Sequence, residues 1–121
     1  METTHFNVVL DIDPIQVGHL LILAKAHVMD LRALSAAQIL ELVMLEKELI
    51  TMLEEQFLVD GVSVIQNNGA IMDDGTHFHV HLVPRYIEDG FWEQQVVEER
   101  GLSVETLRIA LTHLKKRRPL V

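Results

Sequence analysis

Residues 77–82 read HFHVHL, a strict alternation of histidine with an apolar residue. Alternation with period two is typical of a β-strand, in which successive side chains point to opposite faces of the sheet. His77, His79 and His81 would then share one face, about 6.6 Å apart in succession, while the apolar residues between them face a core. The chain therefore needs a sheet with one buried face and one polar face, and the run predicts a strand within residues 76–86.

Shorter apolar runs predict three further strands, at residues 8–10, 18–26 and 62–66. Ser35 and Gln38 form a capping-box pattern that begins an amphipathic helix of about six turns, and Ser103 caps a second helix near the C-terminus. The order is strand, strand, long helix, strand, strand, helix, with short links. This order favours an α+β fold with a mainly antiparallel sheet.

The long helix carries a wide apolar stripe, which predicts core contacts and leaves part of the stripe available for a subunit interface. Its members are Ile39, Leu42, Val43, Leu45, Leu49, Ile50, Met52, Leu53 and Phe57.

The composition excludes several classes of protein. A length of 121 residues predicts a single domain over residues 1–121. The absence of cysteine excludes disulfides, thiol nucleophiles, iron–sulfur clusters and cysteine-based zinc sites. The net charge of −8 argues against nucleic acid or an anionic membrane as a partner. Because no signal-peptide pattern or bilayer-length apolar run is present, we expect a cytoplasmic protein.

Three imidazoles on one strand face point to a functional site, because buried polar groups without hydrogen bonds are costly. In one interpretation, two of the histidines bind zinc with a third ligand from Asp73 or Asp74. In the other, a neutral imidazole attacks phosphorus while neighbouring donors stabilise the phosphoryl oxygens. The alternation alone leaves both interpretations open.

Residues 77–83 resemble the signature of the histidine triad (HIT) family, in which three histidines alternate with apolar residues. Two earlier blocks, residues 11–14 (DIDP) and 18–27 (GHLLILAKAH), are similar to an Asp-Ile turn and a following strand of that family. Residues 67–69 (NNG) stand where the family commonly has Asn-x-Gly. Together these blocks cover residues 8 to 86 in the family's order.

The resemblance implies a five-stranded antiparallel sheet with one long helix and a C-terminal helix, in a homodimer with a nucleotide site on each subunit. It also implies that His79 attacks the α-phosphorus of a nucleoside phosphoramidate or dinucleoside polyphosphate, and that water hydrolyses the nucleotidyl-histidine. His77 and His81 would orient the nucleophile and contact phosphate or leaving group. A histidine at 81, rather than glutamine, favours the hydrolase branch. This chemistry needs no metal or cofactor.

Four further residues receive binding roles from the resemblance. Asp11 would bind the ribose hydroxyls, Ile12 would lie against the base, and Asn67 would contact phosphate. Thr76 would supply a hydroxyl where many members have serine. Turn chemistry is the alternative for Asp11 and Asn67. His19 also matches a family position, with a surface or scaffold role as an equal alternative.

The segment before the triad departs from the family, because Asp73 and Asp74 would repel a phosphate unless they point away or hold a cation. A second hypothesis is therefore a non-catalytic nucleotide- or metal-binding module that uses the histidine row and this acidic loop. A third is an interaction protein that acts through the helix at residues 35–58.

Overall fold

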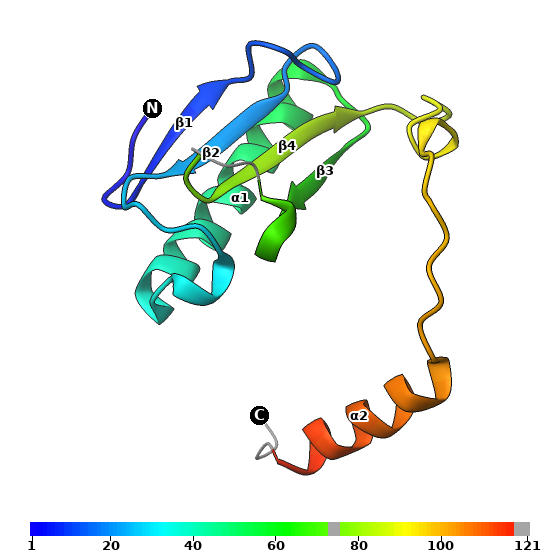
Figure 1. Ribbon diagram of the computed structural model, residues 1–121. Helices are drawn as coiled ribbons and strands as arrows, with labels where there is room; N and C mark the ends of the chain where they lie inside the picture. The colour runs from blue at the N-terminus through cyan, green and yellow to red at the C-terminus, as the bar shows by residue number, and fades with distance from the viewer. Residues whose placement is uncertain (73–75, 118–121) are drawn as a thin grey trace. The chain divides into compact units, whose positions relative to one another are not determined.

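The computed structural model describes residues 1–72 and 76–117 (Figure 1). Its main elements are strands β1 (Phe6–Leu10) and β2 (Leu20–Ala24), helix α1 (Ala36–Phe57), strands β3 (Gly61–Gln66) and β4 (His79–Arg85), and helix α2 (Val104–Lys116). Packing divides the chain into two compact units, one over Met1–Asp89 and one that begins at Gly90. The predicted order of strands and helices is confirmed.

The four strands form one sheet in the order β1-β2-β4-β3, and each neighbouring pair is antiparallel. The predicted α+β class is therefore confirmed. Helix α1 lies along one face of this sheet (Figure 1). Alternate residues of the strands, such as Phe6, Ile22, Val80 and Leu82, are buried in the core together with leucines of α1.

The resemblance implied five strands, whereas the described residues form four. The segment before β1 turns back on that strand, and the Val8 N–H donates to the Met1 carbonyl at 2.8 Å. Only a single bridge, between Glu2 and Asn7, forms there. This segment forms an isolated bridge rather than a further strand, and the four observed strands are those that the apolar runs predicted.

Helix α1 begins at the predicted capping box. The Gln38 N–H donates to Ser35 Oγ, and the Gln38 side chain accepts from the Ser35 N–H. The helix buries Leu42, Leu45, Leu49 and Leu53, a line with steps of three and four residues. The predicted core stripe was too wide, because Ile39, Val43 and Phe57 are exposed. One line of leucines is enough to cover the sheet, so the outer part of the stripe faces away from it.

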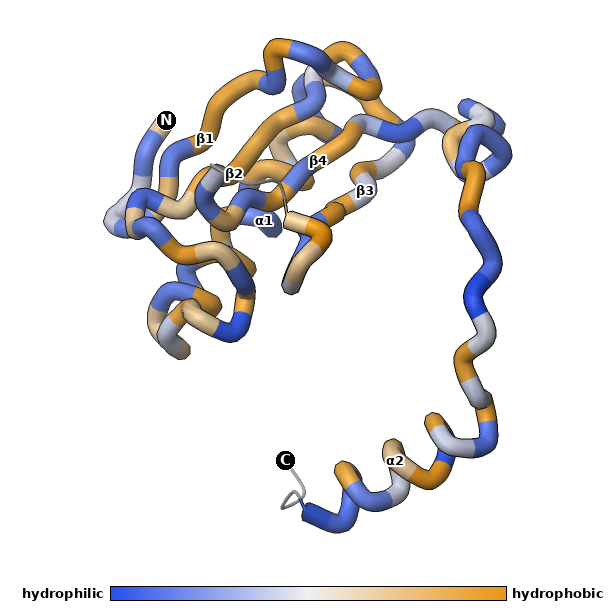
Figure 2. Tube along the Cα trace, in the orientation of Figure 1, coloured by the Kyte–Doolittle hydropathy of each residue, from blue (hydrophilic) through white to orange (hydrophobic). Residues whose placement is uncertain are grey.

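The second unit contains α2, which Ser103 caps by accepting from the Thr106 N–H. Every described residue from Trp92 onward is exposed, and Figure 2 shows apolar and polar segments alternating along α2. One domain over residues 1–121 stays a prediction. Within the described part of the chain, none of the helices combines the length and apolarity that a membrane span requires.

Candidate active site

The face of the sheet opposite α1 carries two of the three predicted histidines. His79 pairs with Leu23 of β2, and His81 pairs with Leu21. Their neighbours Val80 and Leu82 point to the other face and are fully buried. Because side chains alternate along a strand, β4 buries its apolar residues and leaves both imidazoles on the open face.

His77 lies just before β4, so the predicted strand begins later than the alternation indicated. The Phe78 carbonyl still accepts from the Ala24 N–H at the end of β2, whereas the Phe78 N–H donates to the Val28 carbonyl beyond that strand. The His77 ring packs edge-on against His27, with ring centroids 4.5 Å apart. The His77 ring therefore lies against His27, ahead of the first residue of β4.

The tautomer of His79 follows from one hydrogen bond. His79 Nδ1 lies 2.9 Å from the backbone carbonyl oxygen of His77. A carbonyl oxygen only accepts, so Nδ1 must hold the proton and donate it. The lone pair of a neutral His79 is then at Nε2, which is the atom available for attack on an electrophile.

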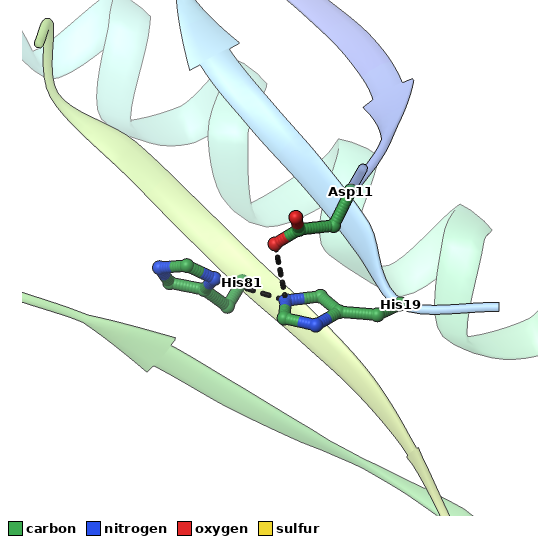
Figure 3. Close-up of side chains that lie close together, drawn as sticks. All are labelled: Asp11, His19 and His81. Atoms are coloured by element: carbon green, nitrogen blue, oxygen red, sulfur yellow. Dashed lines mark hydrogen bonds and ion pairs between the residues drawn. The ribbon is translucent and has the colours of Figure 1, made fainter. Parts of the chain in front are cut away.

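The tautomer of His81 follows from a longer chain of bonds through His19 (Figure 3). The Ile15 N–H donates to His19 Nδ1 at 3.1 Å, so a neutral His19 holds its proton at Nε2. His19 Nε2 lies 2.9 Å from His81 Nδ1 and donates to it. A neutral His81 therefore holds its own proton at Nε2, where it can be donated.

Asp11 completes this group from the end of β1. Its Oδ2 atom lies 3.4 Å from His19 Nε2, and Figure 3 shows the carboxylate and His81 approaching the same edge of the His19 ring. Its Oδ1 atom accepts the Asp13 N–H at 2.8 Å. Asp11 thus takes part in the turn that the sequence allowed as an alternative, and it also faces the histidines.

Burial controls the charge of both linked histidines. It lowers the pKa of His19, and the nearby Asp11 carboxylate partly opposes this shift. The pKa of His81 is also lowered, first by burial and then by the neighbouring His79 and His19 rings. The lowered pKa values favour the neutral rings near pH 7, which is the protonation state that the hydrogen bonds require.

His19 is the residue whose importance the sequence left undecided. It is only 2% exposed. Gly18 positions it with a φ of +91°, and a Cβ atom there would lie 3.3 Å from Pro84 Cγ. In the sequence, the period-two spacing of positions 19, 21 and 23 indicated that these side chains share one face of the sheet. The contact between His19 and His81 could not be predicted in this way, because it depends on strand register.

The remaining predicted binding residues are less closely grouped. The side chain of Ile12 is fully exposed, and Asn67 and Thr76 are partly buried. Asn67 follows the last residue of β3, and continuing the β3–β4 register by one residue would put it opposite His79. Asp73 and Asp74, the predicted metal ligands, lie outside the described residues.

Among the described residues, Asp11, His19 and His81 form a group whose ligand atoms lie within 4.8 Å of one another. Two imidazoles and one carboxylate are a donor set that Zn²⁺ accepts. This set differs from the predicted one, which combined neighbouring triad histidines with the acidic loop.

The antiparallel sheet, the long helix and the imidazoles of the open face define a small α+β protein with a histidine site. A sequence profile described as the HIT domain matches residues 1–88, so the chain belongs to the HIT family. It is similar to an uncharacterized HIT-like protein of Mycoplasma genitalium, with 30% identity over 86 residues. That match covers 70% of this chain and 61% of the relative, so the chain spans about three fifths of the relative's length.

Solved structures of the family have the same fold. A HIT family protein from Bacillus anthracis matches with a TM-score of 0.73 and 27% identity, covering 98% of this chain and 86% of that one. A histidine triad nucleotide-binding protein from Candida albicans matches with a TM-score of 0.69 and 26% identity, covering 96% and 84% of the two chains.

Proposed function

We propose that the protein is a nucleotide hydrolase that cleaves nucleoside phosphoramidates or dinucleoside polyphosphates through a nucleotidyl-histidine at His79. One observation carries this proposal: the bond from His79 Nδ1 to the His77 carbonyl leaves the lone pair at Nε2. Family membership and the nucleotide-binding description of the Candida albicans protein support a nucleotide as the substrate.

In the proposed first step, His79 Nε2 forms a bond to the α-phosphorus while the bond from phosphorus to the leaving group breaks. The N–H at His81 Nε2 donates a hydrogen bond to the leaving nitrogen or oxygen, and solvent supplies the proton that the leaving group takes up. The His79 ring becomes positively charged in the adduct, and its Nδ1–H bond to the His77 carbonyl is stronger in that state.

In the proposed second step, water attacks phosphorus and His79 leaves as the neutral imidazole. The attacking water gives its proton to solvent, while the neutral His81 keeps its Nε2 proton and donates a hydrogen bond to a phosphoryl oxygen. The His19 proton, shared towards His81 Nδ1, and the Asp11 carboxylate hold that ring in one orientation. The released product is a nucleoside monophosphate.

The strand register suggests where the nucleotide lies. Val9 pairs with Leu21, and Leu21 pairs with His81, so these residues form one row across the open face. An apolar Val9–Leu21 surface suits a base, and Asp11 at the end of β1 suits a ribose. The phosphate would then lie over His79 and His81.

Intact-mass spectrometry after rapid quenching tests the proposal, with adenosine 5′-phosphoramidate and a dinucleoside polyphosphate as substrates. We expect a transient adenylyl adduct and AMP release, and we expect His79→Ala to lose both, a reduction of more than about 10⁴-fold. The matched control is His113→Ala, which removes an exposed histidine of α2.

Absence of adduct and product with both substrates contradicts the proposal. AMP release that persists in His79→Ala contradicts the assignment of the nucleophile. Far-UV circular dichroism of each variant separates loss of chemistry from loss of fold.

We also propose that the protein acts as a homodimer. Apolar residues on the outer side of α1 support this proposal, because Leu40, Val43 and Met44 are 64%, 45% and 47% exposed. Such a cluster is typical of an association surface. Light scattering after size-exclusion chromatography should give the mass of a dimer for the wild type and of a monomer for Leu40→Glu. A monomeric wild type contradicts the proposal.

A further inference from the structure

Three atoms that can bind a cation lie close together at one edge of the His19 ring (Figure 3). His19 Nε2 lies 2.9 Å from His81 Nδ1 and 3.4 Å from Asp11 Oδ2. The single proton on His19 Nε2 is the only donor for the lone pairs of both His81 Nδ1 and Asp11 Oδ2, and once that proton is removed His19 Nε2 offers a lone pair as well. A cation with several coordination positions would satisfy every lone pair at once.

The spacing of these atoms suits a tetrahedral ion. Zn²⁺ bonds of about 2.0–2.2 Å hold neighbouring ligand atoms about 3.3–3.5 Å apart. The Asp11–His19 distance of 3.4 Å already has this value. The His19–His81 distance of 2.9 Å must open by about 0.4–0.6 Å, and the Asp11 and His81 ligand atoms lie within 4.8 Å of each other.

Metal binding requires one change in the protonation of His19. Its Nε2 must lose the proton, so a neutral ring must hold the proton at Nδ1. Nδ1 currently accepts from the Ile15 N–H, and two donors cannot share that bond. The Ile15 amide must therefore turn to solvent, which its exposed position in the turn before Gly18 permits.

From these contacts we propose that Asp11, His19 and His81 form a reversible binding site for Zn²⁺. The ligand set is two imidazole nitrogens and one carboxylate oxygen, which leaves a fourth position for water. Imidazole nitrogen favours Zn²⁺ over Mg²⁺, because Mg²⁺ prefers oxygen ligands in octahedral geometry. The Asp11 carboxylate adds a negative charge to the site, whereas the two imidazole ligands are neutral.

The proposed ion and the proposed hydrolysis compete for the same atoms. Zn²⁺ on His81 Nδ1 displaces the His19 proton from that nitrogen and moves the ring whose Nε2–H faces the leaving group in the proposed reaction. Zn²⁺ is therefore an inhibitor of the reaction. This consequence rests on the proposed function, whereas the binding site does not.

Isothermal titration of the full, chelator-treated chain with zinc chloride tests the site directly. We expect one Zn²⁺ per chain at this site, with no competition from millimolar Mg²⁺. Asp11→Asn should weaken binding at least tenfold, because it removes the only anionic ligand. The matched control is Asp13→Asn, which removes the same charge from an exposed position two residues away and should leave affinity unchanged.

A second experiment detects the expected movement of the Ile15 amide rather than the binding affinity. In ¹H–¹⁵N correlation spectra, Zn²⁺ should shift the Ile15 amide in the wild type and in Asp13→Asn. The same addition should not shift it in Asp11→Asn. His19→Gln tests the buried ligand. If His19→Gln does not fold, the comparison of Asp11→Asn with Asp13→Asn still tests the site.

Three results would overturn the site: no binding of Zn²⁺ by the wild type, equal affinity in Asp11→Asn and Asp13→Asn, or an unshifted Ile15 amide in the metal-bound protein. The third result would assign any bound ion to other histidines. Because binding is measured without nucleotide, a protein that binds Zn²⁺ but cleaves no nucleotide separates failure of the proposed function from failure of the site.

Discussion

The two faces of β4 differ in what surrounds their side chains. Val80 and Leu82 are fully buried against the core that α1 covers. His79 and His81 alternate with them on the open face, where hydrogen bonds set the tautomer of each ring. One strand thus supplies packing on one side and ordered lone pairs and protons on the other.

This difference shows how a small domain separates stability from chemistry. A buried apolar side chain contributes through the area it removes from water, and many alternatives of similar size serve equally well. An imidazole on the open face contributes through the position of one proton, which neighbouring donors and acceptors determine. Substitutions on the buried face should therefore change the free energy of unfolding, and substitutions on the open face should change the rate of the proposed reaction.

The largest effect after removal of the proposed nucleophile, His79, is expected at His81. His81→Gln retains a hydrogen-bond donor but removes the ring whose Nε2–H the bond from His19 holds in one orientation. We expect the rate of the proposed hydrolysis to fall by about 10²–10³-fold, because the glutamine amide is not held in that position. Unfolding temperature should change little. A variant with wild-type turnover would contradict the role of the His81 ring as an oriented hydrogen-bond donor.

A substitution on the buried face of β4 should lower stability and leave turnover unchanged. Leu82→Ala removes a fully buried side chain, and we expect it to lower the free energy of unfolding by about 2–5 kcal/mol. Turnover per folded molecule should stay near that of the wild type, because β4 keeps its register. Urea titration and kinetics on the same samples check both statements. Loss of turnover in a fully folded Leu82→Ala sample would show that the faces are coupled.

The smallest effect is expected at Glu41, where α1 meets the segment leading into β1. Hydrogen bonds from Thr3 and then His5 lower the pKa of Glu41 from 4.5 to about 2. The carboxylate therefore contributes stability above about pH 4.5, and this contribution disappears as the pH falls through about 2.

Glu41→Gln should unfold at a lower temperature than the wild type at pH 6, and the difference should shrink as the pH is lowered towards 2. Thermal unfolding followed by circular dichroism measures both. Glu48→Gln, which changes an exposed glutamate of the same helix, is the control for net charge. A difference that stays constant with pH would argue against the hydrogen-bonded carboxylate.

Much of the fold was predictable because it depends on local pattern. Alternation predicted the two faces of β4, and the capping box predicted the start of α1 at its observed position. The predicted helix stripe was too wide, since periodicity does not say which part of an amphipathic helix meets the sheet. The fifth strand came from resemblance rather than from a local pattern.

The sequence alone determined that histidines would share an exposed strand face, because side-chain alternation is a property of the backbone itself. Only the tertiary structure decided which histidines work together. His19 and His81 lie 62 residues apart and meet because β2 pairs with β4, while the ring of His77 lies against His27. Strand register and the turn at Ile15 set these contacts and hence the tautomers, since a proton's position depends on the partners within hydrogen-bond distance.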